Sequence, residues 1–198
     1  MCNMRKYLPV ALALLVLFSV GCSLNPFSSG KSDAQKASDA LNLGLQAHLA
    51  GNLTEAATDY RQALALDPQN KFAYFNLGVI DQTQNNLPSA ESNYRLALGI
   101  DANYGPALFN LAIVRTAAGD TQGAIQLYKQ DTSVDPKNAG AHLNLGLLLR
   151  ASGDTAGANT ELQLAVQLDP TLQGRINSSP TATPITTGTG TPKPTATP

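Results

Sequence analysis

Apolar residues in the middle of the chain recur with helical spacing, and the whole arrangement recurs every 34 residues. Within one 34-residue unit, positions 4, 7 and 8 are mostly apolar or small, and so are positions 20, 24, 27 and 28. Separations of three and four residues place side chains on one face of an α-helix. Each unit therefore predicts two amphipathic helices, and the fold is predicted to be all-α.

Aspartate-proline pairs set the register of the repeat. Asp67-Pro68, Asp135-Pro136 and Asp169-Pro170 lie 68 and 34 residues apart, and Asp101-Ala102 fills the gap. The proline of each pair is expected to end the second helix of its unit. Four units follow from this register: 37–70, 71–104, 105–138 and 139–172.

Several positions hold one kind of residue in every unit. Position 7 is leucine, at Leu43, Leu77, Leu111 and Leu145. Position 8 is small, at Gly44, Gly78, Ala112 and Gly146. Position 20 is alanine, at Ala56, Ala90, Ala124 and Ala158. Position 24 is large, at Tyr60, Tyr94, Tyr128 and Leu162. Small residues at positions 8 and 20 would let the paired helices approach closely.

The turn between the two helices of a unit carries its own signals. Position 15 holds residues that tolerate the left-handed conformation that ends many helices, at Gly51, Asn85, Gly119 and Gly153. Asp120 and Asp154 stand where an N-cap is wanted for the second helix. Pro88 suits the first turn of its helix.

This pattern resembles the tetratricopeptide repeat (TPR) over 136 of the 198 residues. The resemblance implies a right-handed α-solenoid of four TPR helix-turn-helix repeats with an open concave groove. One helix pair cannot bury its apolar face alone, so the units must stack. Ala102, which replaces a proline, and Asp131, which replaces a small apolar residue at a helix contact, depart from the family pattern.

Position 6 carries the strongest functional signal, since it is asparagine in all four units: Asn42, Asn76, Asn110 and Asn144. In TPR proteins this position faces the groove, and asparagine there commonly holds the backbone of an extended peptide. A carboxamide both donates and accepts, so it pairs with a peptide unit of any sequence. The alternative is that asparagine is a common family residue retained without a ligand.

Apolar residues flank these asparagines at positions 5 and 9. Four of them are assigned to the peptide-binding groove, with the phenylalanines as anchors for ligand side chains: Phe75, Phe109, Val79 and Ile113. The alternative for each is an ordinary core position. TPR domains that clamp chaperone C-termini need basic residues at groove positions such as 2, which here holds Ser38, Phe72, Pro106 and Gly140. A chaperone-tail clamp is therefore not expected.

Asp131 is a polar residue at position 27, a helix-packing position where the other three units hold alanine. It is expected to form a structural ion pair with Arg115 or His142, because no nucleophile or second acid accompanies it. The family-like substitution Asp131→Ala should leave stability unchanged or raise it.

The N-terminus has the layout of a secretory signal: Arg5 and Lys6, then a mostly apolar run of 14 residues from Tyr7 to Val20. That run is shorter than the ~20 residues of a membrane-spanning helix. Residues 18–22 resemble the lipobox of bacterial lipoproteins, which implies cleavage after residue 21 and lipid on Cys22. An uncleaved anchor or ordinary cleavage nearby are the alternatives.

Segments 22–36 and 173–198 are expected to flank the fold as a flexible tether and a disordered Thr/Pro-rich tail. No obvious helix follows the fourth unit to cover Leu164, Val166 and Leu168. Either a short turn folds back over them, or they contact a partner, including a second copy of the chain through repeat 4.

Composition excludes several classes of function. The 13 basic and 14 acidic residues leave a net charge of −1, which argues against nucleic-acid binding. Two cysteines, both near the N-terminus, and two distant histidines offer no metal site. No acid–base pair or triad can be assembled, so neither a cofactor nor enzymatic activity is predicted.

The favoured hypothesis is a non-enzymatic scaffold in the cell envelope, lipid-anchored on the extracytoplasmic side of a bacterial membrane. It would bind a partner protein or extended peptide in its groove. The alternative is a subunit of an envelope enzyme or assembly complex that docks through the end of the solenoid.

Overall fold

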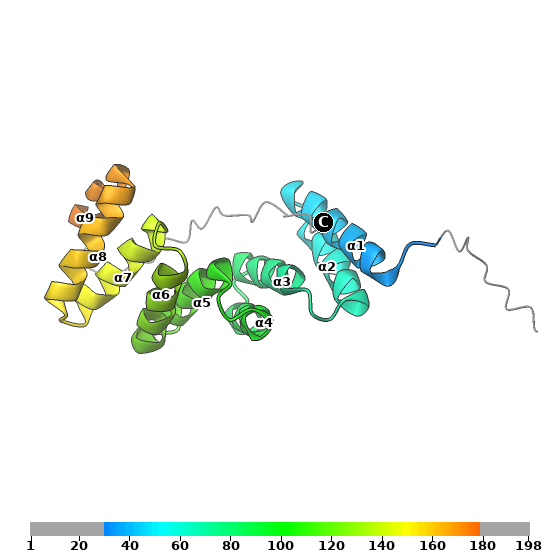
Figure 1. The fold of residues 1–198 in the computed structure, drawn as a ribbon, viewed down its shortest axis with the longest axis horizontal. Helices are drawn as coiled ribbons and strands as arrows, with labels where there is room; N and C mark the ends of the chain where they lie inside the picture. The colour runs from blue at the N-terminus through cyan, green and yellow to red at the C-terminus, as the bar shows by residue number, and fades with distance from the viewer. Residues whose placement is uncertain (1–29, 179–198) are drawn as a thin grey trace, which may run out of the picture. The chain divides into compact units, whose positions relative to one another are not determined.

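The structure, a computed structural model, describes residues 30–178, and every regular element among them is helical. The predicted signal at 1–21, Cys22 and residues from 179 onward lie outside the described residues. The helices follow one another as pairs along the chain (Figure 1). Their bounds are α1 Asp33–Leu49, α2 Leu53–Leu66, α3 Lys71–Thr83, α4 Leu87–Ile100, α5 Gly105–Ala117, α6 Thr121–Val134, α7 Ala139–Ala151, α8 Thr155–Leu168, η1 Pro170–Leu172 and α9 Gln173–Ser178.

The turn inside each pair has the predicted conformation. Backbone φ is positive at the residue in position 15 of every repeat: +82° at Gly51, +59° at Asn85, +80° at Gly119 and +89° at Gly153. The second helix of the last two repeats is then capped by an aspartate that accepts a backbone N–H. The distance is 2.9 Å from Gly123 N to Asp120 and 2.9 Å from Gly157 N to Asp154. Pro88 lies in the first turn of α4.

The two helices of a repeat approach closely where position 8 meets position 24. A Cβ placed on Gly78 would lie 2.5 Å from the ring of Tyr94, and one on Gly44 would lie 2.7 Å from the ring of Tyr60. No side chain fits there without a shift of the tyrosine, because real Cβ atoms do not come this close to other atoms. The small residue at position 8 is therefore what allows a tyrosine to be fully buried between the helices.

Consecutive repeats join mainly where the first helix of one repeat packs on the second helix of the repeat before it. The core that links α1 and α2 to α3 includes Tyr60 and Ala63 from the first repeat and Leu77 and Ile80 from the second. The same arrangement recurs between the later repeats. The helix pairs thus stack into an all-α solenoid of repeats, as the sequence predicts.

Both ends of the solenoid extend beyond the predicted limits. Helix α1 begins at Asp33, inside the segment 22–36 that the sequence assigned to a tether. Ser32 caps it by accepting from Gln35 N, and the Gln35 side chain accepts in return from the Ser32 backbone N–H. Among the described helices, none is long and apolar enough to cross a membrane.

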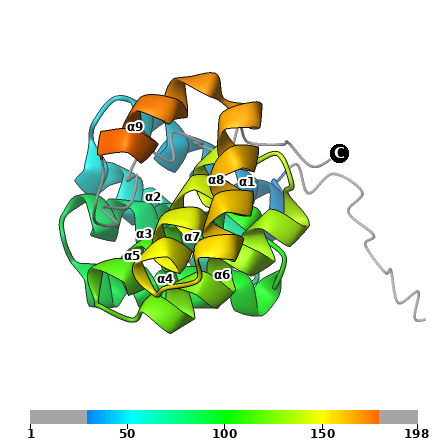
Figure 2. The same cartoon turned by 90° about the vertical axis from the view of Figure 1, so that its left-hand side faces the viewer.

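At the C-terminal end, η1 follows α8, and α9 occupies the first six residues of the predicted disordered tail. Leu172 is 8% exposed and packs on Leu143, Leu147 and Leu162, with Ile176 beside them. Figure 2 shows α7, α8 and α9 grouped at this end. Helix α9 begins 34 residues after α7, so it is the start of a fifth first helix, of which the structure describes six residues. A short turn does fold back at this end, but it does not bury the three residues in question: Leu164 and Val166 are half-buried and Leu168 is 36% exposed.

Candidate functional site

The four asparagines of position 6 do not form a row of free carboxamides, which corrects the sequence prediction. Asn76 and Asn144 are buried, at 5% and 2% exposure, while Asn110 is half-buried and Asn42 is exposed. The Asn76 amide donates to the Phe72 carbonyl of its own helix at 2.9 Å. Buried amides that already bond within the chain have no face to offer a ligand.

Two of these asparagines reach back to the tyrosine of the preceding repeat. Asn144 Nδ2 donates to the Tyr128 hydroxyl at 3.0 Å, and the Asn110 side chain hydrogen-bonds the Tyr94 hydroxyl. The Tyr94 hydroxyl in turn donates to Gln82 Oε1 at 2.7 Å. The asparagine therefore supplies a partner to a buried hydroxyl that would otherwise be costly to desolvate. Because no repeat precedes α1 within the described residues, Asn42 has no such tyrosine to reach there.

Three of the four predicted apolar groove residues are also core residues. Phe75, Phe109 and Ile113 are 2%, 6% and 4% exposed. The Phe75 ring lies edge-on to Tyr104 at 5.4 Å between centroids, and Phe109 lies edge-on to Tyr128 at 5.7 Å. These rings are inside the joints between repeats, so they cannot anchor a ligand side chain. The prediction for them is wrong, and their alternative as core is correct.

Most of what remains accessible at the predicted groove positions lies on the first two repeats, although Pro106 and Asn110 of the third repeat are also half-buried. We call it the α1–α3 surface and define it by six residues that are exposed or half-buried: Leu41, Asn42, Leu45, Leu49, Phe72 and Val79. Leu41, Leu45 and Leu49 share one face of α1, since they are four residues apart. Leu49 is 69% exposed, the most exposed large apolar residue described. Val79 is the one predicted apolar groove residue in this set.

Sequence reasoning missed Leu49 because it weighed only positions 2, 5, 6 and 9 as groove positions. Leu49 occupies position 13 of the first repeat, where Thr83, Ala117 and Ala151 stand in the others. The available signal was that only the first repeat has a leucine at position 13, where the other repeats have small or polar residues.

The two ends of the solenoid are largely polar. In repeats 2 to 4, positions 3, 7 and 10 are apolar and buried against the preceding repeat, as in Ala73, Leu77 and Ile80. In the first repeat the same positions are Asp39, Leu43 and Gln46, and Leu43 is 55% exposed.

The C-terminal end has the matching substitutions. Thr155 and Asn159 are exposed on α8, at the positions where Leu53 and Ala57 pack in the first repeat. Both stay exposed although η1 and α9 cover Leu162 at this end, and the apolar Leu168 is 36% exposed. Docking through an end of the solenoid therefore stays an alternative.

Asp131 is fully buried on α6, and neither predicted ion pair forms. Arg115 instead bonds Glu91 at 2.7 Å and Asp120 at 2.9 Å. Asp131 Oδ2 accepts from Asn138 Nδ2 at 2.9 Å, while its Oδ1 has no hydrogen-bond partner among the described residues. Burial raises the pKa of this carboxyl to about 7, the nearby charge of Asp135 adds to the rise, and the Asn138 hydrogen bond opposes it.

His142, the second predicted partner of Asp131, is buried between two other acceptors. Its Nδ1 lies 2.6 Å from Glu161 Oε2, and its Nε2 lies 3.1 Å from the Pro136 carbonyl oxygen. The geometry leaves no room for an ion pair with Asp131, because both ring nitrogens are already engaged.

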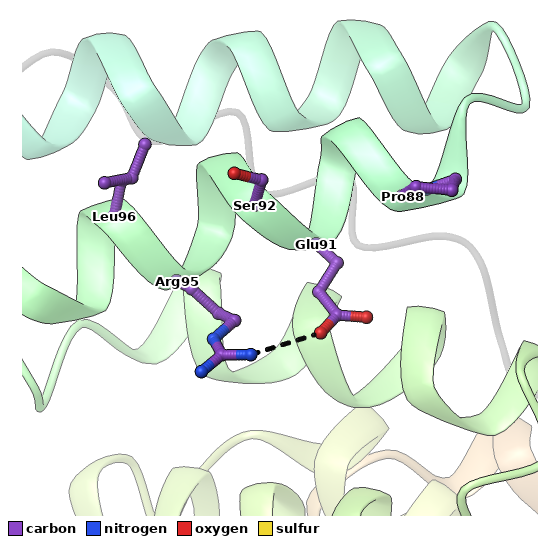
Figure 3. A pocket seen from close by; sticks show the side chains of 5 residues that line it. All are labelled: Pro88, Glu91, Ser92, Arg95 and Leu96. Carbon is purple, nitrogen blue, oxygen red and sulfur yellow. Dashed lines mark ion pairs between the residues drawn. The ribbon is translucent and has the colours of Figure 1, made fainter.

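A surface pocket of about 370 Å³ lies on one face of α4, lined by Pro88, Glu91, Ser92, Arg95 and Leu96 (Figure 3). Its two charged residues are already paired, with Arg95 3.5 Å from Glu91 and Glu91 also bonded to Arg115. No acid–base pair or nucleophile is poised in this pocket. Within residues 30–178, no group of three histidine, cysteine or acidic side chains comes together to hold a metal ion.

Comparison with known protein families finds tetratricopeptide repeats in both halves of the array. The model of a TPR repeat matches residues 44–85, and a second tetratricopeptide repeat model matches residues 115–175. No curated protein matches the chain in sequence.

Three solved structures show the same fold. MamA is 21% identical, with a TM-score of 0.63 over 68% of this chain and 79% of that one. PilF of Pseudomonas aeruginosa is 25% identical, with a TM-score of 0.62 over 71% and 64%. The first TPR of Spaghetti (RPAP3), bound to an HSP90 peptide, is 24% identical, with a TM-score of 0.58 over 62% and 98%.

Proposed function

The chain belongs to the tetratricopeptide repeat proteins, and from that premise we propose that it binds an extended segment of a partner protein on the α1–α3 surface. It acts as a scaffold without catalysis of its own, held on the extracytoplasmic side of a bacterial membrane by lipid on Cys22. The observation that carries the binding proposal is the exposure of Asn42 next to the leucine stripe of α1 that ends at Leu49.

The chemistry of the α1–α3 surface suits a peptide in extended conformation. A free carboxamide at Asn42 can donate to and accept from one peptide unit. The apolar groups on either side, Leu45, Leu49 and Phe72, can bury alternate side chains of the same segment. Affinity would then come from main-chain hydrogen bonds and selectivity from apolar side chains.

A similar fold with a bound peptide supports this mode of binding. The first TPR of Spaghetti is bound to a peptide of HSP90. The ligand of the present chain is proposed to differ from an acidic chaperone tail, because position 2 holds no basic residue in any repeat. An apolar or neutral segment fits the leucine-rich surface better.

Site-specific photocrosslinking tests the surface and captures whichever protein binds there. A photoreactive residue replaces Leu49 in one variant and Leu43 in the other, and both are expressed in cells and irradiated on intact membranes. Both leucines are exposed on the same helix, at 69% and 55%, so each substitution leaves the core untouched. The proposal expects a discrete crosslinked protein from position 49 and none from position 43.

The opposite result would favour the alternative function. A crosslink from position 43 alone would place the partner on the N-terminal end of the solenoid. Crosslinks from a third variant, labelled at the 36%-exposed Leu168, would place it on the C-terminal end. Either outcome would indicate a subunit that docks through an end.

The membrane anchor is tested separately. Cys22→Ser removes the thiol that would carry the lipid, so we expect the variant to lose acylation and to leave the membrane fraction. Mass analysis of the mature N-terminus checks the same point. An unmodified Cys22, or retention of residues 1–21, would remove the anchor from the proposal and leave the binding surface standing.

A further inference from the structure

The joint between the third and fourth repeats holds a buried carboxyl that the rest of the fold does not neutralise. Asp131 is 0% exposed and receives one hydrogen bond, from Asn138 Nδ2 to its Oδ2. The other oxygen, Oδ1, is buried without a hydrogen-bond partner among the described residues. An ionised carboxylate in this position lacks most of the donors that water would give it.

Space for this carboxyl is provided by a glycine in the same repeat. A Cβ on Gly105, at the start of α5, would lie 3.1 Å from Asp131 Oδ1. The equivalent first position in the other repeats is Ala37, Lys71 or Ala139. A side chain at this position would crowd Oδ1, so the glycine leaves the space that the carboxyl group occupies.

A second titratable side chain crosses the same joint. His142 on α7 contacts Glu161 of α8 through Nδ1 and the Pro136 carbonyl through Nε2.

We propose that this joint is a pH-responsive hinge, closed when Asp131 is protonated and loosened when Asp131 ionises. In the loosened state the buried carboxylate gains water, so α7 and α8 separate locally from α5 and α6 without unfolding of the first two repeats. The inference is independent of the proposed binding function, since it concerns the opposite half of the solenoid. Because each repeat contacts only its neighbours, such a local opening is compatible with the rest of the array staying folded.

The groups around Asp131 set the direction of the effect. Asp135, at the end of the same helix, adds negative charge, while Asn138 from the following turn donates one hydrogen bond. Among the described residues, no cation is paired with it: Arg115 of α5 bonds Glu91 and Asp120, and on α7 His142 bonds Glu161. Burial with a like charge raises the pKa to about 7 from an ordinary 3.8.

The pH range follows from those two values. A solvated Asp131 in the opened joint ionises near pH 4, whereas the closed joint keeps its proton up to about pH 7. The closed joint therefore binds more protons in this range, and raising the pH favours opening. Between pH 5 and pH 8 the opening equilibrium should rise by roughly 10- to 100-fold.

Amide hydrogen exchange followed by NMR measures this opening directly. The probes are the backbone amides of Ala141 and His142, which donate to Asn138 Oδ1 and to the Asn138 carbonyl. The matched internal controls are Ala73 and Tyr74, which make the same two bonds to Asn70 in the second repeat. There position 27 of the preceding repeat is Ala63 instead of an aspartate.

After correction for intrinsic exchange, the protection of Ala141 and His142 should fall by at least tenfold between pH 5 and pH 8. The protection of Ala73 and Tyr74 should stay nearly constant. In Asp131→Asn, which keeps the shape of the protonated carboxyl, the fall should disappear. Glu55→Gln, an exposed carboxylate in the first repeat, is the control variant and should behave as the wild type.

Wild-type protection that is flat across this range, or a fall that survives in Asp131→Asn, would overturn the hinge. So would an equal fall at Ala73 and Tyr74, because that would show global unfolding instead of a local joint. If Asp131→Asn does not fold, Asp131→Ala supplies the same test, since it also removes the titrating group.

Discussion

The joint between the first and second repeats and the joint between the third and fourth repeats have the same backbone geometry, but their buried side chains differ in chemistry. In each, an asparagine at position 34 caps the next helix through its side-chain oxygen, which accepts at 3.1 Å from Ala73 N or from Ala141 N. The Asn70 amide then donates to Asp67 in the turn, whereas the Asn138 amide donates to the buried Asp131. Asp131 occupies position 27 of its repeat. In the first joint, position 27 holds Ala63, which has no carboxyl group.

The comparison teaches that the repeat determines geometry more strictly than it determines chemistry. Cap distances agree between the joints, yet one interior is apolar and the other holds a carboxyl group. Two local adjustments accompany the carboxyl: Gly105 leaves room for it, and the Asn138 amide turns toward it. A joint without these adjustments should not tolerate the same residue.

Ala63→Asp transfers the carboxyl to the first joint and has the largest expected effect. Ala63 is fully buried, and the small residue that would have to make room is Ala37 instead of a glycine. A buried charge without adequate partners should lower the free energy of unfolding by about 3–5 kcal/mol at pH 8. Urea denaturation followed by circular dichroism measures the loss.

Ala65→Asp, at an exposed position two residues further on, is the control and should change the free energy of unfolding by less than about 0.5 kcal/mol. If Ala63→Asp were as harmless as its control, the first joint would have the same capacity for a carboxyl as the last one. The role given to Gly105 would then be wrong.

Asp131→Ala makes the last joint resemble the first, and we expect it to stabilise the protein at pH 8. The pKa of Asp131 is about 7 in the folded chain against 3.8 in the unfolded chain, so ionisation weakens the folded state progressively between about pH 4 and pH 7. At 1.36 kcal/mol per pKa unit the effect has a ceiling of about 4 kcal/mol. Loss of the hydrogen bond from Asn138 offsets part of it, which leaves a gain of about 1–2 kcal/mol.

Thermal melts at pH 8 and at pH 4 check this prediction. The gain in melting temperature should be present at pH 8 and should shrink strongly at pH 4, where the aspartate is protonated in the folded chain and only partly ionised in the unfolded chain. A clear loss of stability at pH 8 would show that the carboxylate is paired and needed.

Asn144→Ala sharpens the comparison within the asparagine column and has the smallest effect. It removes the amide that donates to the buried Tyr128 hydroxyl, so it should cost about 1 kcal/mol. Asn42→Ala, at the exposed position in the first repeat, should leave the free energy of unfolding within about 0.5 kcal/mol of wild type. Urea denaturation of both variants under the same conditions compares their free energies of unfolding. It distinguishes Asn144, which hydrogen-bonds the preceding repeat, from the exposed Asn42. Equal losses would undo the distinction.

Much of the fold follows from the sequence because periodic features determine it locally. The 34-residue register, the positive φ at Gly51 and Asn85, and the aspartate caps depend on neighbours within one repeat. The short helix α9 was not predicted, because it continues the register for six residues before the Thr/Pro-rich segment begins.

The site was less predictable, because identical residues in a column face different surroundings. Asn42 and Asn144 share a position and a residue type, yet one is exposed and the other bonds a tyrosine of the preceding repeat. What separates them is whether a repeat precedes, together with the contacts that stacking creates. The partner of Asp131 was missed for a related reason. Charge complementarity suggested Arg115, but the turn before α7 places the neutral Asn138 beside Asp131, and Arg115 pairs with Glu91.

The most direct test of the central claim compares partner crosslinking from position 49 in two backgrounds. The claim is that the first repeats bind the partner, while the later asparagines fasten the solenoid. At a temperature well below the melting transition, Asn42→Ala should sharply reduce the crosslinked product, and Asn144→Ala should leave it unchanged. A product that is lost in Asn144→Ala and kept in Asn42→Ala would contradict the account.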